Sequence, residues 1–162
     1  MKFVVASPSE AKLSEASQLL GDLPRTEFRR GSIADAGTDC TAAIVHYTIA
    51  HDRYGGTPTV GRAQVLQNSR NDGAPPVILA TPPPLEPGAS VDMGGPPEVA
   101  DHVMRMLSMA IAEWIRSPWY PHGRSEILCL LHIEGAGLDF GGFELIARGI
   151  RWALAEYVGM PA

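Results

Sequence analysis

An apolar run that ends in a cluster of glycines most restricts how this chain can fold. Residues 127–133 read Ile-Leu-Cys-Leu-Leu-His-Ile, and four glycines follow between Gly135 and Gly142. A helical pattern of apolar residues begins near Glu144. A short, continuously apolar run is typical of a strand buried on both faces, as in parallel sheets flanked by helices. The order of strand, glycine loop and helix therefore indicates an α/β fold.

The same junction is a candidate anion site. A helix N-terminus carries partial positive charge, and glycines let a phosphate approach backbone N–H groups closely. A simple tight turn is the alternative that glycine alone would also explain. Because four glycines fall within eight residues between a strand and a helix, the phosphate site and the tight turn both stay open.

Strand and helix patterns alternate along the rest of the chain. We expect strands at 2–6, 28–33, 41–48, 76–81 and 126–133, and helices at 7–20, 98–117 and 144–158. The first helix is predicted to be capped by Ser7, with Pro8 at its first position and Glu10 three residues after the cap. The sequence thus predicts one domain over 1–162, a three-layer α/β/α sandwich around a mixed, mostly parallel sheet.

The loops of such a sheet indicate where a ligand would bind. Ligands of open α/β sheets bind beyond the carboxyl ends of the strands, and loops at 49–61, 82–97 and 134–143 would converge there. Residues 82–97 contain six prolines and three glycines, so we expect no regular structure in them. A binding loop and a plain surface insertion are both open for this segment.

Composition narrows the class of protein. Hydrophobic residues make up 45% and charged residues 19% of the chain, as in folded globular domains. A net charge of −5 argues against general nucleic-acid binding. Cys40 and Cys129 lack metal-type spacing, so we expect buried free thiols and neither metal nor cofactor. We find no signal peptide and no membrane-spanning segment, and expect a cytoplasmic protein.

Several segments occur in an order known from one family. They are Arg30-Gly-Ser-Ile-Ala-Asp35, Asp39-Cys-Thr-Ala-Ala-Ile-Val45, Tyr54-Gly-Gly56 with Val60-Gly61, Gly61-Arg-Ala-Gln-Val65 leading to Val77-Ile-Leu79, and Gly135-Ala-Gly-Leu-Asp-Phe-Gly-Gly-Phe143. In this order, across roughly residues 28–158, the chain resembles a divergent macrodomain, the ADP-ribose-binding module. The resemblance implies a macrodomain-like sandwich that binds ADP-ribose or an ADP-ribosylated macromolecule.

The resemblance implies roles for the second glycine-rich loop. The backbone amides of Gly135, Ala136, Gly137 and Leu138 would hold the diphosphate. Phe140 would face the distal ribose, as the aromatic residue of the family's loop does.

The resemblance also implies roles at the other end of the ligand. Gly55 and Gly56 would let the first glycine loop close over the phosphates and ribose, and Ile33 would pack against adenine. Ser32 stands where the family has an acidic residue that recognises the adenine amino group. A serine there could accept one hydrogen bond, which implies a weaker adenine contact.

Two further positions depart from the family pattern. Residues His46-Tyr-Thr-Ile49 replace the family's Asn-Ala-Ala-Asn run, so Ile49 stands where an asparagine positions the ribose and the catalytic water. Asp139 lies inside the second loop and must face outward, because a carboxylate aimed inward would repel a diphosphate.

Hydrolysis of an ADP-ribosyl bond needs an activated water, for which His46, His51 and Asp52 are the candidate catalytic residues. A histidine could act as base with Asp52 orienting it. The alternatives are a core role for His46 and ordinary loop positions for His51 and Asp52. The sequence therefore predicts ADP-ribose binding and leaves removal of ADP-ribose from targets open. The competing interpretation is an α/β enzyme or binding protein for another phosphorylated ligand, with the ADP-ribose site altered or lost.

Overall fold

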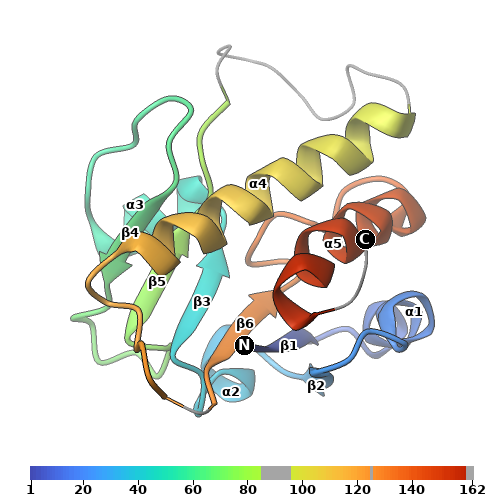
Figure 1. The fold of residues 1–162 in the computed structure, drawn as a ribbon, viewed down its shortest axis with the longest axis horizontal. Coiled ribbons are helices and arrows are strands. Elements are labelled where there is room, and N and C mark those ends of the chain that lie inside the picture. Colours follow the sequence, from blue (N-terminus) through green and yellow to red (C-terminus); the bar gives the residue numbers. More distant parts are fainter. Residues whose placement is uncertain (85–95, 125, 160–162) are drawn as a thin grey trace.

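The fold is an α/β/α sandwich around one six-stranded sheet. The structure is a computed structural model that describes residues 1–84, 96–124 and 126–159. Within them the sheet order is β2-β1-β6-β3-β5-β4 (Figure 1). The strands are β1 (Lys2–Ser7), β2 (Thr26–Arg30), β3 (Ala42–Val45), β4 (Gln64–Gln67), β5 (Val77–Ala80) and β6 (Leu128–His132). The helices are α1 (Glu10–Leu20), α2 (Ile33–Ala36), α3 (Tyr47–Tyr54), α4 (Pro96–Arg116) and α5 (Phe143–Val158).

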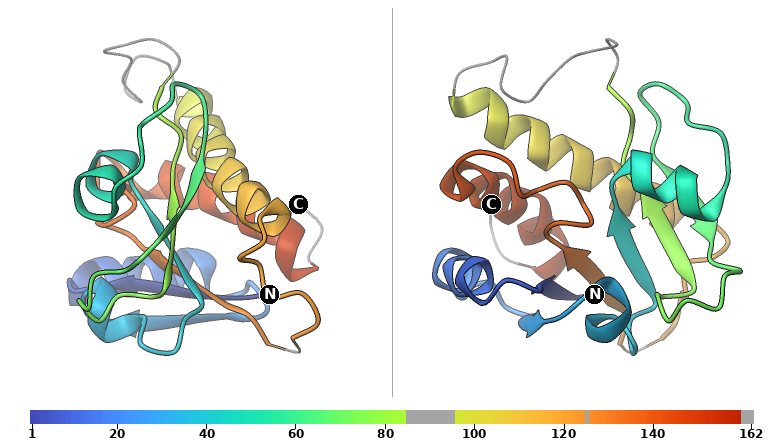
Figure 2. Two further views of the ribbon diagram at one scale, coloured as in Figure 1. Left: turned by 90° about the vertical axis from the view of Figure 1, so that its left-hand side faces the viewer. Right: turned by 180° about the vertical axis from the view of Figure 1, so that it is seen from behind.

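Helices cover both faces of this sheet. All neighbouring strands pair in parallel except β4 and β5, which pair antiparallel. Because side chains alternate along a strand, Phe3 and Val5 pack with α1, α4 and α5, whereas Val4 and Ala6 pack with α2 and α3. Figure 2 shows α3 on one side of the sheet and α4 with α5 on the other. The predicted fold class is confirmed.

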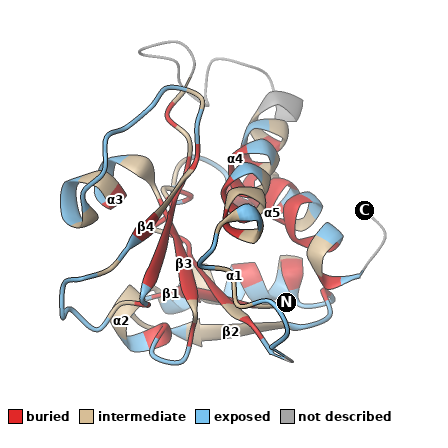
Figure 3. Ribbon diagram, turned by 60° about the vertical axis from the view of Figure 1, so that its left-hand side comes forward, coloured by how far each residue is buried: buried red, intermediate tan, exposed pale blue. Residues whose placement is uncertain are grey.

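The core lies at the centre of the sheet. Strands β1, β3 and β5 are buried almost throughout (Figure 3). The apolar stripe predicted for α4 faces the sheet, and Trp114 of this helix is fully buried. No helix in the described part of the chain has the length and hydropathy that crossing a bilayer requires.

The start of α1 differs from the prediction. The capping residue is Ser9, whose side chain accepts a hydrogen bond from the Lys12 amide at 3.2 Å. Ser7 is instead the last residue of β1, in register with Arg30 of β2. The predicted cap was wrong because continued pairing with β2 keeps Ser7 in the sheet.

Three short elements differ from the sequence prediction. The strand expected at 41–48 ends at Val45, and α3 follows it directly. The strand expected at 28–33 is β2, which ends at Arg30 and is followed by α2. Strand β4 was not predicted, because its two apolar residues lie between glutamines.

The proline-rich segment was predicted to be irregular from 82 to 97. Helix α4 begins at Pro96, so the last two residues of that prediction were wrong. A proline suits the first position of a helix because that position has no N–H partner in the helix. Residues 85–95 lie outside the described part of the chain.

Candidate functional site

The carboxyl ends of β1, β6 and β3 meet at the point where the chain connections diverge. From β1 the chain passes through α1, on one face, to β2. From β3 it leaves through α3, on the other face, toward β4. In open α/β sheets such a switch point opens a crevice where ligands bind. Here Ser7, His46 and the loop after His132 surround it.

His132 fixes the glycine loop in place. Its side chain is 6% exposed, and its Nδ1 accepts a hydrogen bond from the Gly135 amide at 3.0 Å. Because an amide can only donate, the neutral ring carries its proton on Nε2, which donates to the Gly31 carbonyl at 3.0 Å. His132 thus ties the loop after β6 to the turn between β2 and α2. The sequence analysis missed this role, although a histidine in an apolar strand next to glycines was a signal for it.

In the first half of the loop, the backbone amides donate hydrogen bonds to nearby residues of the same segment. Besides Gly135, Ala136 donates to the His132 carbonyl at 2.8 Å, Gly137 to the Glu134 carbonyl at 3.0 Å and Leu138 to the Ile133 carbonyl at 2.9 Å. The side chains of Ala136 and Leu138 are fully buried. The four amides predicted to hold a diphosphate therefore already have acceptors within the protein. For this half of the loop, the tight-turn interpretation describes the geometry.

The second half of the loop is open. Asp139 is exposed, and a Cβ atom built on Gly141 or Gly142 would meet nothing within 4 Å. Gly142 precedes the 16-residue helix α5 and supplies no side-chain cap. The N–H groups of residues 139–142 have no acceptor among the described residues, and those of the first helical turn have none within a helix. A run of N–H groups without an acceptor among the described residues therefore precedes α5, at the positive end of this helix.

Lys12 adds positive charge to this helix terminus. Its Nζ lies 5.6 Å from the centre of the Phe143 ring, at the first residue of α5. Lys12 forms no ion pair with any residue that the structure describes. Its charge is therefore available to an anion at the start of α5.

Ile33 and His46 pack directly onto the glycines of the loop. A Cβ atom on Gly135 would lie 2.8 Å from Ile33 Cδ1, and one on Gly137 would lie 2.7 Å from His46 Cδ2. Gly137 also has a φ of +72°, which side-chain-bearing residues rarely adopt. Ser32, next to Ile33, is exposed, and its side chain caps α2 by accepting from the Asp35 amide at 3.1 Å. The structure thus brings together the predicted site residues at 32–33, 46 and 135–137.

The ring of His46 is oriented by its own helix. Nδ1 accepts from the Thr48 amide at 3.4 Å and lies 2.7 Å from Thr48 Oγ1. Burial lowers the pKa of His46, and the charge of His102 on α4 lowers it further. The ring is therefore neutral near pH 7, with its proton on Nε2. In this arrangement His46 offers an N–H donor, whereas its lone pair is engaged by Thr48.

Glu134 is a further polar residue at the crevice that the sequence analysis missed. Its Oε2 accepts from the Ser7 hydroxyl at 2.7 Å, and Ser7 Oγ accepts from the Ser9 amide at 3.1 Å. Its Oε1 is buried and has no partner among the described residues. Glu134 places negative charge beside α1, so an anionic ligand group fits the α5 side of the crevice instead.

The first glycine pair lies away from this crevice. A Cβ atom on Gly56 would meet Leu66 Cδ2 at 2.9 Å and His51 Nδ1 at 3.2 Å, and His51 Nδ1 contacts the Gly55 carbonyl at 2.8 Å. Gly56 therefore packs on β4, which β3 and β5 separate from β6 by roughly 14 Å at the usual strand spacing, whereas a Cβ on Gly55 would meet nothing within 4 Å. The structure does not bring Gly55, Gly56 or His51 to the second loop, and Asp52 is exposed on α3.

The crevice offers donors for an anion and little for a metal. Among the residues that the structure describes, no three His, Cys, Asp or Glu side chains gather as a metal site would require. Cys40 and Cys129 are buried and free. Fold and site together define an α/β/α sandwich with a glycine loop at the carboxyl edge of its sheet. The sequence matches no protein-family model and no curated protein.

Proposed function

We propose that this crevice binds the diphosphate of ADP-ribose or of a closely related nucleotide ligand. The observation that carries the proposal is the uncapped N-terminus of α5, where the N–H groups of residues 139–142 have no acceptor among the described residues and Lys12 lies against the Phe143 ring. A helix N-terminus stabilises an anion through its oriented N–H groups and its dipole. The resemblance to macrodomains suggests the same loop, with the phosphate contacts moved from 135–138 to its second half.

The remaining contacts would come from both sides of the loop. A helix terminus and one lysine contribute only about 1–3 kcal/mol together, so useful affinity needs contacts with the rest of the ligand. Ile33 offers an apolar side chain for the base, and Phe140, half-buried beside the free amides, offers a ring for the distal ribose. The Nε2–H of His46 would donate to a phosphate or ribose oxygen between them.

We propose binding without hydrolysis. Because the His46 lone pair accepts from Thr48, the ring lacks the free acceptor that a general base needs. His51 and Asp52 lie on α3, and the His51 ring lies beside Gly56. Ile49 is apolar and 37% exposed. Within residues 46–54, Ile49 stands where the family has its water-positioning asparagine, and an apolar side chain cannot hold a water in that way.

A different phosphorylated ligand is the second candidate. The hydroxyl of Ser32 already accepts from the Asp35 amide, so only one lone pair remains for an adenine amino group, and the serine lacks the charge of the family's acidic residue. This observation favours a ligand with the same phosphate chemistry and a different base, or with none.

Titration calorimetry with ADP-ribose, ADP, AMP and inorganic phosphate separates these candidates. Affinity that falls in the order ADP-ribose, ADP, AMP supports the proposal. Equal affinity for ADP-ribose and inorganic phosphate would assign the site to a smaller phosphorylated ligand. Absence of binding to all four contradicts a phosphate site at α5. A parallel assay that detects AMP or free ADP-ribose released from modified protein should show no turnover.

A further inference from the structure

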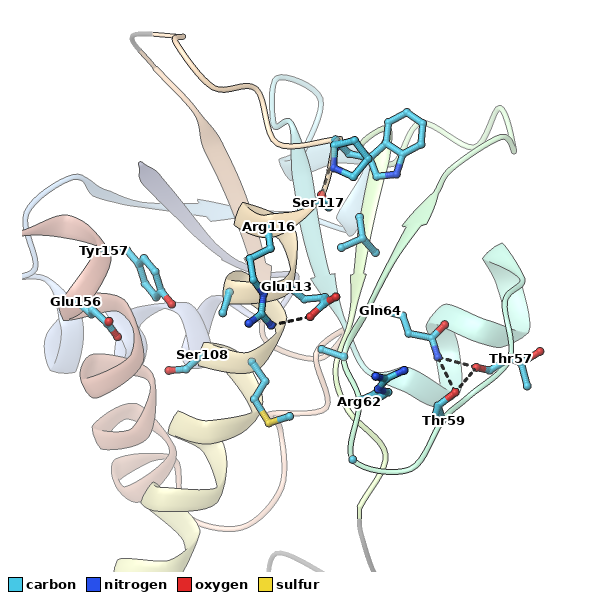
Figure 4. A pocket seen from close by; sticks show the side chains of 17 residues that line it. Thr57, Thr59, Arg62, Gln64, Ser108, Glu113, Arg116, Ser117, Glu156 and Tyr157 are labelled. Carbon is cyan, nitrogen blue, oxygen red and sulfur yellow. Dashed lines mark hydrogen bonds and ion pairs between the residues drawn. The ribbon is translucent and has the colours of Figure 1, made fainter.

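A groove of about 1250 Å³ lies on another part of the molecule, between α4 and the segment that leads into β4 (Figure 4). One wall consists of α4 residues that include Ser108, Glu113 and Arg116. Arg62 and Gln64 lie on the facing wall (Figure 4). The groove is separate from the crevice at β1, β6 and β3.

The edge of the sheet at this groove has free backbone groups. The Asn68 amide donates to the Pro76 carbonyl at 2.8 Å, which makes this a hydrogen-bonded pair of the antiparallel β4–β5 ladder. Such pairs alternate with pairs that share no hydrogen bond. In the register of β4 and β5, Val65 and Gln67 therefore turn their N–H and C=O groups outward. These groups can accept a further strand.

The opposite edge of the sheet is protected. On β2, Glu27 pairs with Lys2 at 3.0 Å and with Arg29 at 2.7 Å, and Arg29 also pairs with Asp39. Charged side chains along an edge oppose pairing with another strand. The sequence of β4, Gln-Val-Leu-Gln, carries no charge. Only one of the two edges is therefore suited to strand addition.

Exposed apolar side chains gather around the open edge. Val60 is 55% exposed, Met109 40% and Trp119 45%. Met109 and Trp119 line the groove. Val60 does not line it, but in the sequence it lies between Thr59 and Gly61, which do. Large exposed apolar side chains that cluster at one surface mark an interaction site.

The charges of the groove suit a second copy of the same chain. Its lining contains two arginines, Arg62 and Arg116, and two glutamates, Glu113 and Glu156. A two-fold interface places the same patch on both partners, so a patch of one charge sign would repel itself. The balanced groove avoids this repulsion, although the whole chain has a net charge of −5.

We propose that the β4 edge and this groove form a two-fold interface between two copies of the chain. Strand β4 of one copy pairs antiparallel with β4 of the other and joins the two sheets. Four residues of strand pairing are too few for a stable dimer, which typically buries about 800 Å² per partner. Met109 and Trp119 therefore supply much of the buried surface.

Sedimentation velocity from about 1 to about 100 µM protein tests this interface. We expect a concentration-dependent dimer. Trp119→Ala should weaken association at least about tenfold, because exposed tryptophans dominate such interfaces. Trp152→Ala is the matched control: Trp152 is 38% exposed, lies on α5 outside the groove, and should leave association unchanged.

Two further variants address the strand edge and the charges. Val65→Pro removes an outward N–H without removing a hydrogen bond of the β4–β5 ladder, and it also replaces a side chain that packs against the core. It should abolish association if the protein folds. If Val65→Pro fails to fold, Arg62→Glu replaces it, because Arg62 is exposed and its reversal unbalances the groove. A monomer at every concentration overturns the proposal. A dimer that resists both Trp119→Ala and Arg62→Glu also overturns it, because its interface would then lie elsewhere.

Discussion

The two glycine-rich segments of this chain have similar backbones and opposite surroundings. Gly55 and Gly56 have φ values of +88° and +74°, and Gly137 and Gly141 have +72° and +54°. The first pair follows the end of α3, and its second member, Gly56, packs on the edge strand β4. The second pair follows a central parallel strand and precedes α5. Glycine content alone therefore does not distinguish the two segments; only the second one leads into a long helix, whose N-terminus we propose as the anion site.

The two halves of the second glycine loop also differ in whether their backbone N–H groups are already hydrogen-bonded. Amides 135–138 close a turn against β6, whereas amides 139–142 have no acceptor among the described residues. The glycines of the first half admit the side chains of Ile33 and His46. Those of the second half leave open space in front of α5. Only the second half has both the donors and the room for a ligand.

A matched pair of alanine substitutions should show the largest difference between the two segments. In Gly137→Ala the new Cβ meets His46, and in Gly56→Ala it meets Leu66, both in left-handed backbone. Each should lower the free energy of unfolding by about 1–3 kcal/mol, measured by urea denaturation. Only Gly137→Ala should also weaken ADP-ribose binding, by about tenfold or more. Equal binding losses in the two variants would contradict the distinction.

Gly142→Asp should separate stability from binding. An aspartate at the N-cap can accept from the first N–H groups of α5 and should raise the free energy of unfolding by a few tenths of a kcal/mol relative to glycine. The same carboxylate would occupy the phosphate position and should weaken ADP binding about tenfold or more. Gly142→Ala, which adds no acceptor, is the control and should nearly retain affinity. An aspartate variant that binds ADP normally would place the phosphate elsewhere.

A smaller effect is expected for Lys12. Lys12→Gln removes the charge of a half-buried lysine near α5 and should weaken ADP binding about three- to fivefold at low salt, with no effect on adenosine. Lys2→Gln removes a lysine from the amino end of β1, where it pairs with Glu27, and should leave ADP affinity unchanged. Equal losses of ADP affinity in both variants would mean that the net charge of the protein, and not the position of Lys12, determines ADP binding.

The smallest effect concerns pH. Burial lowers the pKa values of His46 and His102; the charge of His102 lowers that of His46 further, and Arg105 lowers that of His102 against the opposing effect of Asp101. The unfolded chain then binds more protons than the folded one below about pH 6.5. Stability should therefore be full above that pH and fall as the pH drops through the folded-state values. His46→Gln should flatten this decline in urea titrations between about pH 7 and pH 5. If the dependence of the free energy of unfolding on pH were unchanged in this variant, protonation of His46 would not cause the decline.

The sequence predicted the fold class because its central strands are apolar throughout and its long helices are strongly periodic. It missed α3 because the β-branched Thr48 and Ile49 favour a strand locally, whereas the His46 cap and the end of the sheet pairing start a helix there. It missed β4 because Val65 and Leu66 gain strand structure only by pairing with β5.

The candidate site was predicted only in part. The glycine loop and His46 could be found from sequence because they follow apolar strands, and Ile33 was named from the resemblance. The His132 and Glu134 contacts could not, because their partners Gly31 and Ser7 are more than 100 residues away in the chain. The position of Gly55 and Gly56 depended on α3, which local sequence did not reveal.

Amide chemical shifts measured during titration with ADP test directly whether phosphate binds at the N-terminus of α5. We expect the largest shifts for the N–H groups of residues 139–145, a smaller response near Ile33, and none at Gly55 and Gly56. Shifts centred on residues 55–63, or none in either segment, would contradict a phosphate site at the N-terminus of α5.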